Sequence, residues 1–144
     1  MDSLPTQIQL DVVTPERELV HESVFSLSVP GKNGYLGILP GHAPLLSELQ
    51  PGELSYVEDH ATRYLSVSWG FIEVLPQRVI VLAQTAERAE EIDVERAQRA
   101  KQRAEERLKN VTAADIDFER ARAALMRALA RLQAAGHVKG EPSA

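Results

Sequence analysis

The sequence predicts two parts of different fold class: an antiparallel all-β domain, either a sandwich or a barrel, and then an antiparallel two-helix hairpin. In the first half, short runs with an apolar residue at every second position recur about every ten residues. Strong helix formers replace them near residue 87, and every proline except Pro142 lies before residue 77. We therefore expect a β domain over residues 1–86, a helical hairpin over 87–136 and a disordered tail over 137–144.

The expected strands follow one another along the first half. The first, over residues 7–13, directs Ile8, Leu10 and Val12 to one side of the sheet. Further strands are expected over 24–31, 53–59, 63–69, 70–76 and 78–84. The alternation slips by one position at Gly70, which predicts a β-bulge or a strand break at this point.

Two helices are expected after the last strand. The first covers about residues 88–109, and the second covers about 116–135 and ends at Gly136. Thr112 or Asp115 is expected to cap the second helix. The apolar stripes consist of Ile92, Ala97, Ala100, Ala104 and Leu108 on the first helix, and of Ala121, Leu125, Ala128 and Leu132 on the second.

Alanine dominates both stripes, and a buried alanine contributes only about 0.8 kcal/mol, against about 1.5–3 kcal/mol for leucine or phenylalanine. Two hypotheses follow. The hairpin is either an ordinary closely packed pair of helices, or a switch whose weakly docked helices survive release and adopt a second arrangement.

Arginines cluster on both helices. They are Arg96, Arg99, Arg103 and Arg107 on the first, and Arg120, Arg127 and Arg131 on the second. Such clusters are either solvated faces or sites for an anion, namely a phosphate group or an acidic partner surface. A nucleic-acid target is not expected, because the net charge of the chain is −5 and no aromatic side chains alternate with the arginines.

Composition excludes several further classes of protein. The chain has no cysteine, which excludes disulfide frameworks, thiolate zinc sites and cysteine nucleophiles. Its first residues, MDSLPTQIQL, lack the features of a signal peptide, and no segment approaches the roughly 20 apolar residues of a membrane span. We expect a soluble protein that reaches a membrane only through a partner.

No catalytic pattern stands out. The four histidines, His21, His42, His60 and His137, lack the close spacings of metal motifs. The chain has no Gly-x-Ser-x-Gly elbow and no Walker phosphate loop. His42, within PGHAP, is interpreted as a structural or interface residue, with a catalytic role as the alternative.

Four segments in order resemble the epsilon subunit of bacterial F-type ATP synthases. In chain order they are LDVVTPER (10–17), GYLGILPGHAPLL (34–46), SWGFIEV (68–74) and VIVLAQTAERAEEID (79–93). The resemblance covers about residues 6–135 and implies an amino-terminal β-sandwich of about ten strands followed by two helices. It further implies a non-catalytic rotor subunit that needs no cofactor. Such a subunit binds gamma and the ring of c subunits, and joins proton-driven rotation to ATP synthesis at the cytoplasmic face of the bacterial inner membrane.

The same resemblance implies where the partners bind. The expected contacts with gamma and the c-ring are Tyr35, Leu36, Gly37, Pro40, Gly41, His42, Ala43 and Pro44. Within this segment, Tyr35 is expected near the c-ring and His42 near gamma. The sequence departs from the family at Tyr35, where many relatives carry an acidic or polar residue, and at Trp69, where glycine is usual.

The resemblance also implies two roles for the hairpin. In an extended state the helices obstruct ATP hydrolysis and contact acidic segments of the alpha and beta subunits, here through Arg120, Arg122, Arg127 and Arg131. In the folded state some bacterial members bind ATP through an Ile/Leu-Asp-x-x-Arg-Ala motif. The matching residues here are Ile92, Asp93, Arg96 and Ala97, with Glu87, Arg103, Arg127 and Arg131 as further contacts. The motif is equally acceptable as the first turn of any helix, with Asp93 near its positive end.

Three functional hypotheses therefore stand. A rotor and regulatory subunit would bind gamma, and its enzyme would hydrolyse ATP faster without residues 87–144. A freestanding small-molecule sensor would bind ATP with no rotor partner. A β-sandwich enzyme using His42 would lose turnover in His42→Ala.

Overall fold

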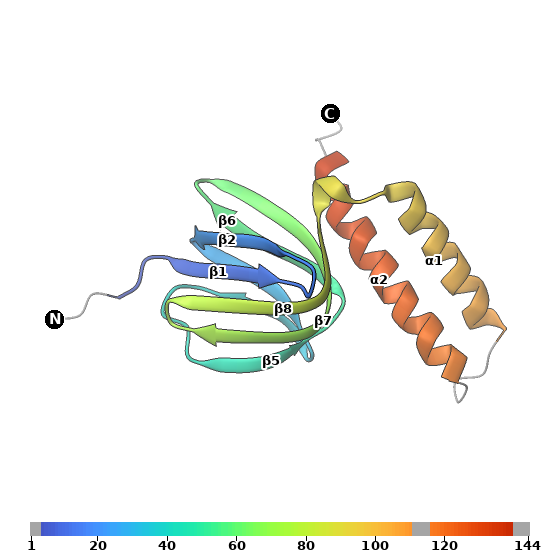
Figure 1. Cartoon of the computed structure of the whole chain (residues 1–144), viewed down its shortest axis with the longest axis horizontal. Helices are drawn as coiled ribbons and strands as arrows, with labels where there is room; N and C mark the ends of the chain where they lie inside the picture. The colour runs from blue at the N-terminus through green and yellow to red at the C-terminus, as the bar shows by residue number, and fades with distance from the viewer. Residues whose placement is uncertain (1–3, 111–115, 140–144) are drawn as a thin grey trace.

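The alternating pattern of the first half produces a β-sandwich whose strands belong to one continuous hydrogen-bonded sheet that folds back on itself (Figure 1). A computed structural model gives the structure, and it describes residues 4–110 and 116–139. The strands of the described part are β1 (Ile8–Val13), β2 (Glu18–Val24), β3 (Ser26–Gly31), β4 (Gly34–Ile38), β5 (Leu45–Leu49), β6 (Gly52–Glu58), β7 (Ala61–Leu75) and β8 (Arg78–Arg88). The expected β-sandwich is thus confirmed, with eight strands where about ten were expected.

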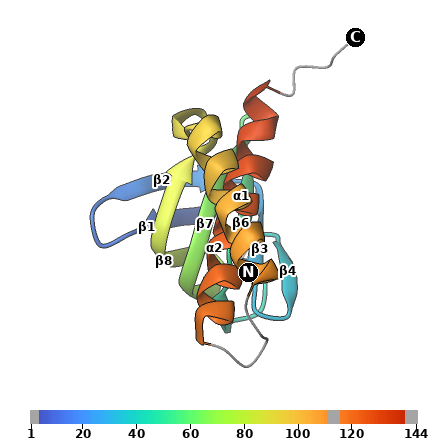
Figure 2. The ribbon, with the colours of Figure 1, turned by 90° about the vertical axis from the view of Figure 1, so that its right-hand side faces the viewer.

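The helical half follows the sandwich directly. A short 3-10 turn, η1 (Ala89–Glu91), leads into α1 (Val94–Lys109) and then α2 (Ile116–Lys139). The helix packed on the sandwich is α2, which contacts β6, β7 and η1, while α1 packs on α2 (Figures 1 and 2). The hairpin is therefore folded against the sandwich in this structure.

The core of the sandwich contains the side chains that the alternation predicts. Ile8, Leu10 and Val12 of β1 are completely buried, as are Ile72 and Val74 of β7. Hydrogen bonds order the strands β2-β1-β8-β7-β5-β3-β4, and β6 pairs with β3 and β7. All these pairs are antiparallel except β1 with β8, which is parallel.

The slip at Gly70 is a change in backbone conformation within one long strand. The two strands expected over 63–69 and 70–76 form the single strand β7, so the strand break expected as one alternative does not occur. Trp69 and Gly70 have φ angles of 57° and 126°, and here β7 exchanges its partner β6 for β5. Two consecutive left-handed residues shift the alternation by one, so that the side chains after residue 70 keep their apolar face toward the core.

The helix bounds differ from those expected at the start of the first helix and at the end of the second. Residues 88–93 are not part of α1, because β8 continues to Arg88, which pairs with Leu65 of β7, and the 3-10 turn η1 follows. Gly136 does not end the second helix, and residues 137–139, which were expected in a disordered tail, form the last turn of α2. The expected caps, Thr112 and Asp115, lie outside the described residues.

Candidate functional site

A pocket of about 340 Å³ lies between the two helices. Its walls include Arg103 and Arg107 of α1, with Arg127 and Arg131 of α2. Alanines make the rest of the lining: Ala100, Ala104, Ala121, Ala124 and Ala128. Within each helix the two arginines are four positions apart, so they project from the same face. Because no carboxylate of the described residues lines the pocket, its chemistry suits an anion with several charges, such as a chain of phosphate groups.

Arg131 links this pocket to the sandwich. Its Nε donates a hydrogen bond of 2.7 Å to Oε1 of Glu87, and both side chains are about one-third exposed (34% and 31%). The sequence predicted both residues as ligand contacts, and the structure brings them together as an ion pair between α2 and β8.

The motif over residues 92–97 lies outside the residues that line the pocket. Asp93 is the N-cap of α1, and its Oδ1 accepts a hydrogen bond from the amide of Arg96. Ile92 packs with Ala134 and Ala135 of α2, Ala97 is completely buried, and the Arg96 side chain is exposed. Three of the predicted ATP contacts, Arg103, Arg127 and Arg131, do line the pocket. Arg107 was expected in the arginine cluster of the first helix but was not among the predicted ATP contacts, although its spacing of four from Arg103 is a usable signal.

Arg120 and Arg122 are not among the residues that line the pocket. Both are exposed on α2. In the folded hairpin they are therefore accessible to another molecule.

The segment expected to contact gamma and the c-ring forms β4 and the turn that follows it. Tyr35 is 55% exposed, and its hydroxyl oxygen accepts a hydrogen bond from the amide of Glu53. The amide of Gly41, at a φ of 84°, donates to the carbonyl of Pro76. His42 Nδ1 lies 2.7 Å from the carbonyl oxygen of Ala43, so this ring nitrogen donates to the turn.

An exposed apolar surface extends from this turn over the outer face of β5, β7 and β8. Phe71 and Leu82 are directly opposite each other on neighbouring strands and are 52% and 53% exposed. We call the whole set the outer apolar surface, and it consists of Leu39, Leu46, Phe71, Leu75 and Leu82. Sequence reasoning missed it, although runs such as GFIEVLP and VIVLAQ are apolar at outward positions as well as inward ones.

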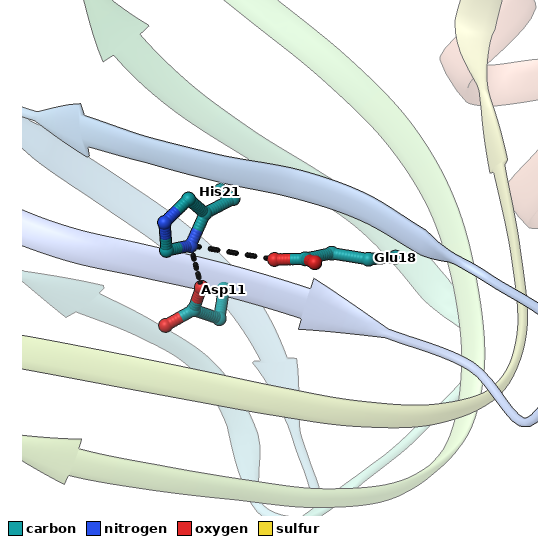
Figure 3. Close-up of side chains that lie close together, drawn as sticks. All are labelled: Asp11, Glu18 and His21. Carbon is teal, nitrogen blue, oxygen red and sulfur yellow. Dashed lines mark hydrogen bonds and ion pairs between the residues drawn. The ribbon is translucent and has the colours of Figure 1, made fainter.

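One cluster of side chains has the composition of a metal site. Asp11, Glu18 and His21 place potential ligand atoms within 4.8 Å of one another (Figure 3). Both oxygens of Asp11 have partners, however: Oδ1 lies 2.5 Å from His21 Nδ1, and Oδ2 lies 3.3 Å from the guanidinium of Arg78. The hydrogen bond with Asp11, followed by the charges of Asp11 and Glu18, raises the pKa of His21. We interpret the cluster as an ion-pair network that joins β1, β2 and β8.

Two protein-family models match consecutive parts of the chain. The model described as ATP synthase, delta/epsilon chain, beta-sandwich domain matches residues 7–89, and the model of the long alpha-helix domain of the same chain matches residues 90–136. The chain belongs to the ATP synthase delta/epsilon family. The family boundary falls one residue after the end of β8, and the expected boundary at residue 86 stays a prediction.

Curated relatives of this delta/epsilon chain carry the name ATP synthase epsilon chain. The protein of Koribacter versatilis (strain Ellin345) is 56% identical over 101 residues, which are 70% of this chain and 71% of the relative. ATP synthase epsilon chain 2 of Syntrophotalea carbinolica is 45% identical over 130 residues, 90% of this chain and 94% of the relative. The recognition of an epsilon-type chain is thereby confirmed.

Two solved structures resemble the folded delta/epsilon chain. One is a chain of the mitochondrial ATP synthase of Euglena gracilis, from a cryo-EM structure of OSCP, F1 and the c-ring. It matches with a TM-score of 0.79 at 25% identity, over 93% of this chain and 84% of the other. A chain of the central stalk and c-ring structure from Tetrahymena thermophila matches with a TM-score of 0.57 at 12% identity, over 92% and 98%, which supports the fold alone.

In the described part of the delta/epsilon chain, neither helix is long and apolar enough to cross a membrane. Family membership favours the first of the three hypotheses over a freestanding sensor or an enzyme that uses His42.

Proposed function

We propose that this delta/epsilon chain is a non-catalytic central-stalk subunit of a bacterial, proton-translocating F-type ATP synthase. It binds gamma and the c-ring, joins c-ring rotation to ATP synthesis in the catalytic head, and lies at the cytoplasmic face of the inner membrane through these partners. The matches to both family models over residues 7–136 support this role, as do the relatives named ATP synthase epsilon chain. The similar chain of the F1/c-ring structure supports the same place in the assembly.

The outer apolar surface is the observation that carries the attachment to gamma. Large exposed apolar patches on otherwise soluble proteins mark interaction sites, and here Phe71 and Leu82 form a central pair about half exposed. Leu39, within the segment expected to contact gamma and the c-ring, is 65% exposed and belongs to this surface. Gamma covers the sheet face in this proposal, and the c-ring contacts the end that carries Tyr35.

Binding of purified gamma subunit tests this attachment. Phe71→Lys/Leu82→Lys places two charges in the centre of the surface, and we expect the affinity for gamma to fall by at least about tenfold. The matched control is Leu129→Lys, which changes a 45% exposed leucine on α2, away from the surface. Equal loss in both variants, or unchanged binding in the double variant, would contradict the proposed attachment.

The hairpin inhibits ATP hydrolysis in its released, extended state. Arg120, Arg122, Arg127 and Arg131 then contact acidic segments of alpha and beta. The high helix propensity of α1 and α2 supports helices that persist after release. The enzyme assembled with a chain that ends at Glu91 is expected to hydrolyse ATP several times faster than the enzyme with the full chain. This shortened chain keeps β8 whole and retains the 2.6 Å ion pair of Glu91 with Arg17.

ATP binds the folded hairpin in the arginine-lined pocket and favours that state. Four guanidinium groups around about 340 Å³ supply charge for the phosphates, and ATP would join α1 to α2 by bridging arginines of both helices. The residues of the 92–97 motif lie at the start of α1, where Asp93 caps the helix. They would contact the nucleoside part of ATP only if the binding site extends along the hairpin beyond the pocket.

Calorimetric titration of the isolated chain with Mg-ATP tests the pocket. We expect binding that Arg127→Ala/Arg131→Ala abolishes. The control, Arg120→Ala/Arg122→Ala, removes the same charge from the same helix at positions that do not line the pocket, and it should bind as the parent does. Absence of binding at millimolar ATP, or equal loss in both variants, would contradict the proposed site.

A further inference from the structure

The carboxylate of Glu73 lies within the outer apolar surface. Glu73 is directly opposite Leu46 of β5 and Ile80 of β8, so its side chain is on the same face of the sheet as theirs. On its own strand, Phe71 and Leu75 are two positions away on either side and face outward too, whereas the residues between them are buried. The exposed side chain of Glu73 therefore has apolar neighbours on all four sides.

The charge of Glu73 has no partner within the described part of the chain, where its carboxylate makes neither an ion pair nor a hydrogen bond. Arg78 faces outward further along β8, but its guanidinium lies 3.3 Å from Oδ2 of Asp11 and pairs with that carboxylate. Glu48, which also faces outward on β5, differs because its carboxylate pairs with Lys32 at 2.9 Å. In the chain alone, only water solvates the charge of Glu73.

A partner that covers the outer apolar surface removes this water from Glu73. Burial of a carboxylate among apolar groups is unfavourable unless an opposite charge or hydrogen-bond donors face it, and charged residues are accordingly depleted at the centres of protein interfaces. A carboxylate at such a centre is therefore expected to meet a cation of the partner. The surrounding apolar side chains then exclude water and strengthen the pair.

We propose that gamma presents a basic side chain, an arginine or a lysine, to Glu73, and that this ion pair is the charged centre of an otherwise apolar attachment. The inference rests on the proposed binding of gamma to the outer apolar surface, and it specifies the chemistry of the partner face. The pair also fixes the position of gamma on the sheet. A displacement by one strand spacing, about 4.8 Å, would leave both charges buried without partners.

Replacement of Glu73 by leucine separates this ion pair from a carboxylate that gamma merely tolerates, because the two cases change the affinity in opposite directions. Glu73→Leu makes the surface continuously apolar. Without a cation on gamma, the variant would bind more tightly, since no carboxylate has to lose its water. With a cation on gamma, the variant leaves that cation against apolar side chains, and binding weakens. Glu73→Gln keeps the shape of the side chain and removes only the charge.

The test is binding of purified gamma to the full chain, with association and dissociation rates measured by surface plasmon resonance. We expect the affinity to fall by at least about thirtyfold in Glu73→Leu and about tenfold in Glu73→Gln, mainly through faster dissociation. The matched control, Glu105→Gln, removes the same charge from an exposed position on α1 and should change the affinity by less than about twofold. Because Glu73 is exposed in the chain alone, its variants should unfold at about the same urea concentration as the parent.

The outcomes distinguish the ion pair from the attachment on which it rests. Unchanged or tighter binding of Glu73→Leu to gamma would overturn the ion pair, and the attachment would stand if Phe71→Lys/Leu82→Lys still binds weakly. An equal loss of affinity in Glu73→Gln and Glu105→Gln would overturn the ion pair in the same way. Absence of binding by the parent, or unchanged binding in Phe71→Lys/Leu82→Lys, would instead overturn the attachment itself and the ion pair with it.

Discussion

At Gly70 the backbone leaves no space for a side chain. A Cβ at this position would lie 1.8 Å from the carbonyl oxygen of Leu82, and the φ of 126° is a conformation that other residues rarely adopt. Gly136 is the opposite case, since a Cβ there would meet nothing within 4 Å and the residue lies inside α2. The fold therefore requires glycine at Gly70 but not at Gly136.

Substitution of these glycines by alanine should change stability in opposite directions. We expect Gly70→Ala to lower the free energy of unfolding by more than about 3 kcal/mol, because β7 or β8 must move. Gly136→Ala should stabilise the helix by about 0.5–1 kcal/mol. Urea denaturation followed by the fluorescence of Trp69 reports the first change, and the far-ultraviolet circular dichroism of the helices reports the second. A mild effect at Gly70 would contradict the close approach to Leu82.

The Asp11–His21 pair makes the stability of the sandwich depend on pH. Because the folded state raises the pKa of His21, the stabilisation is fully present below the ordinary histidine pKa of about 6.5 and is lost as the pH rises through the folded value. His21→Gln should therefore unfold at lower denaturant concentration than the parent near pH 5.5, and at nearly the same concentration near pH 9. A difference between the two chains that is constant over this range would contradict the ion pair.

At the scale of elements, local propensity and sheet pairing compete where the sandwich joins the hairpin. The residues from 88 onward are good helix formers, yet Glu87 and Arg88 pair with Ser66 and Leu65 of β7 and so belong to β8. The helix starts only after Asp93, whose side chain accepts a hydrogen bond from the amide of Arg96. The order and type of the elements could be predicted from periodicity, whereas their ends depend on partners distant in sequence.

The candidate site was predicted only where its residues share a helix face. Spacing predicted the arginine clusters of the two helices, and the family resemblance named Arg103, Arg127 and Arg131 as the ligand contacts within them. The ion pair of Glu87 with Arg131 and the contact of His137 with Glu53 join residues far apart along the chain. The separation of such pairs depends on how α2 docks, which no local pattern encodes.

Within the hairpin, like charges around the pocket oppose the folded state. Arg107→Gln removes one charge of the Arg103–Arg107 pair, and we expect the helices to gain a few tenths of a kcal/mol while the affinity for Mg-ATP falls. Arg99→Gln removes the same charge from an exposed position outside the pocket and should alter neither property by as much. Thermal unfolding with and without Mg-ATP measures both effects. Tighter ATP binding in Arg107→Gln would contradict the role assigned to this arginine.

At the scale of the whole molecule, the sandwich has its own hydrophobic core, and the helical hairpin adds few side chains to it. The core cluster of the sandwich contains no residue of α1 or α2, and the hairpin shares only a small alanine-rich cluster with η1. Stability and mobility are therefore assigned to different halves of the chain.

The sandwich should fold alone. A chain that ends at Glu91 uncovers mainly Tyr64 and the serines of β7, which water solvates. We expect cooperative unfolding with a midpoint only a few degrees below that of the full chain, measured by the fluorescence of Trp69. Loss of cooperative unfolding would show that α2 is part of the folding unit. It would also leave faster ATP hydrolysis in the shortened chain without a simple interpretation.

The change of backbone conformation at Trp69–Gly70 divides the outer side of β7 into two surface regions. Before it, Tyr64 and Ser66 lie under α2; after it, Phe71 and Leu75 belong to the outer apolar surface. Under the proposed function, one strand thus presents separate faces to the hairpin and to gamma. Docking of the hairpin and binding of gamma involve different side chains of β7. Their free energies should therefore add with little coupling. Such a rotor subunit would release or dock its hairpin without weakening its binding to gamma.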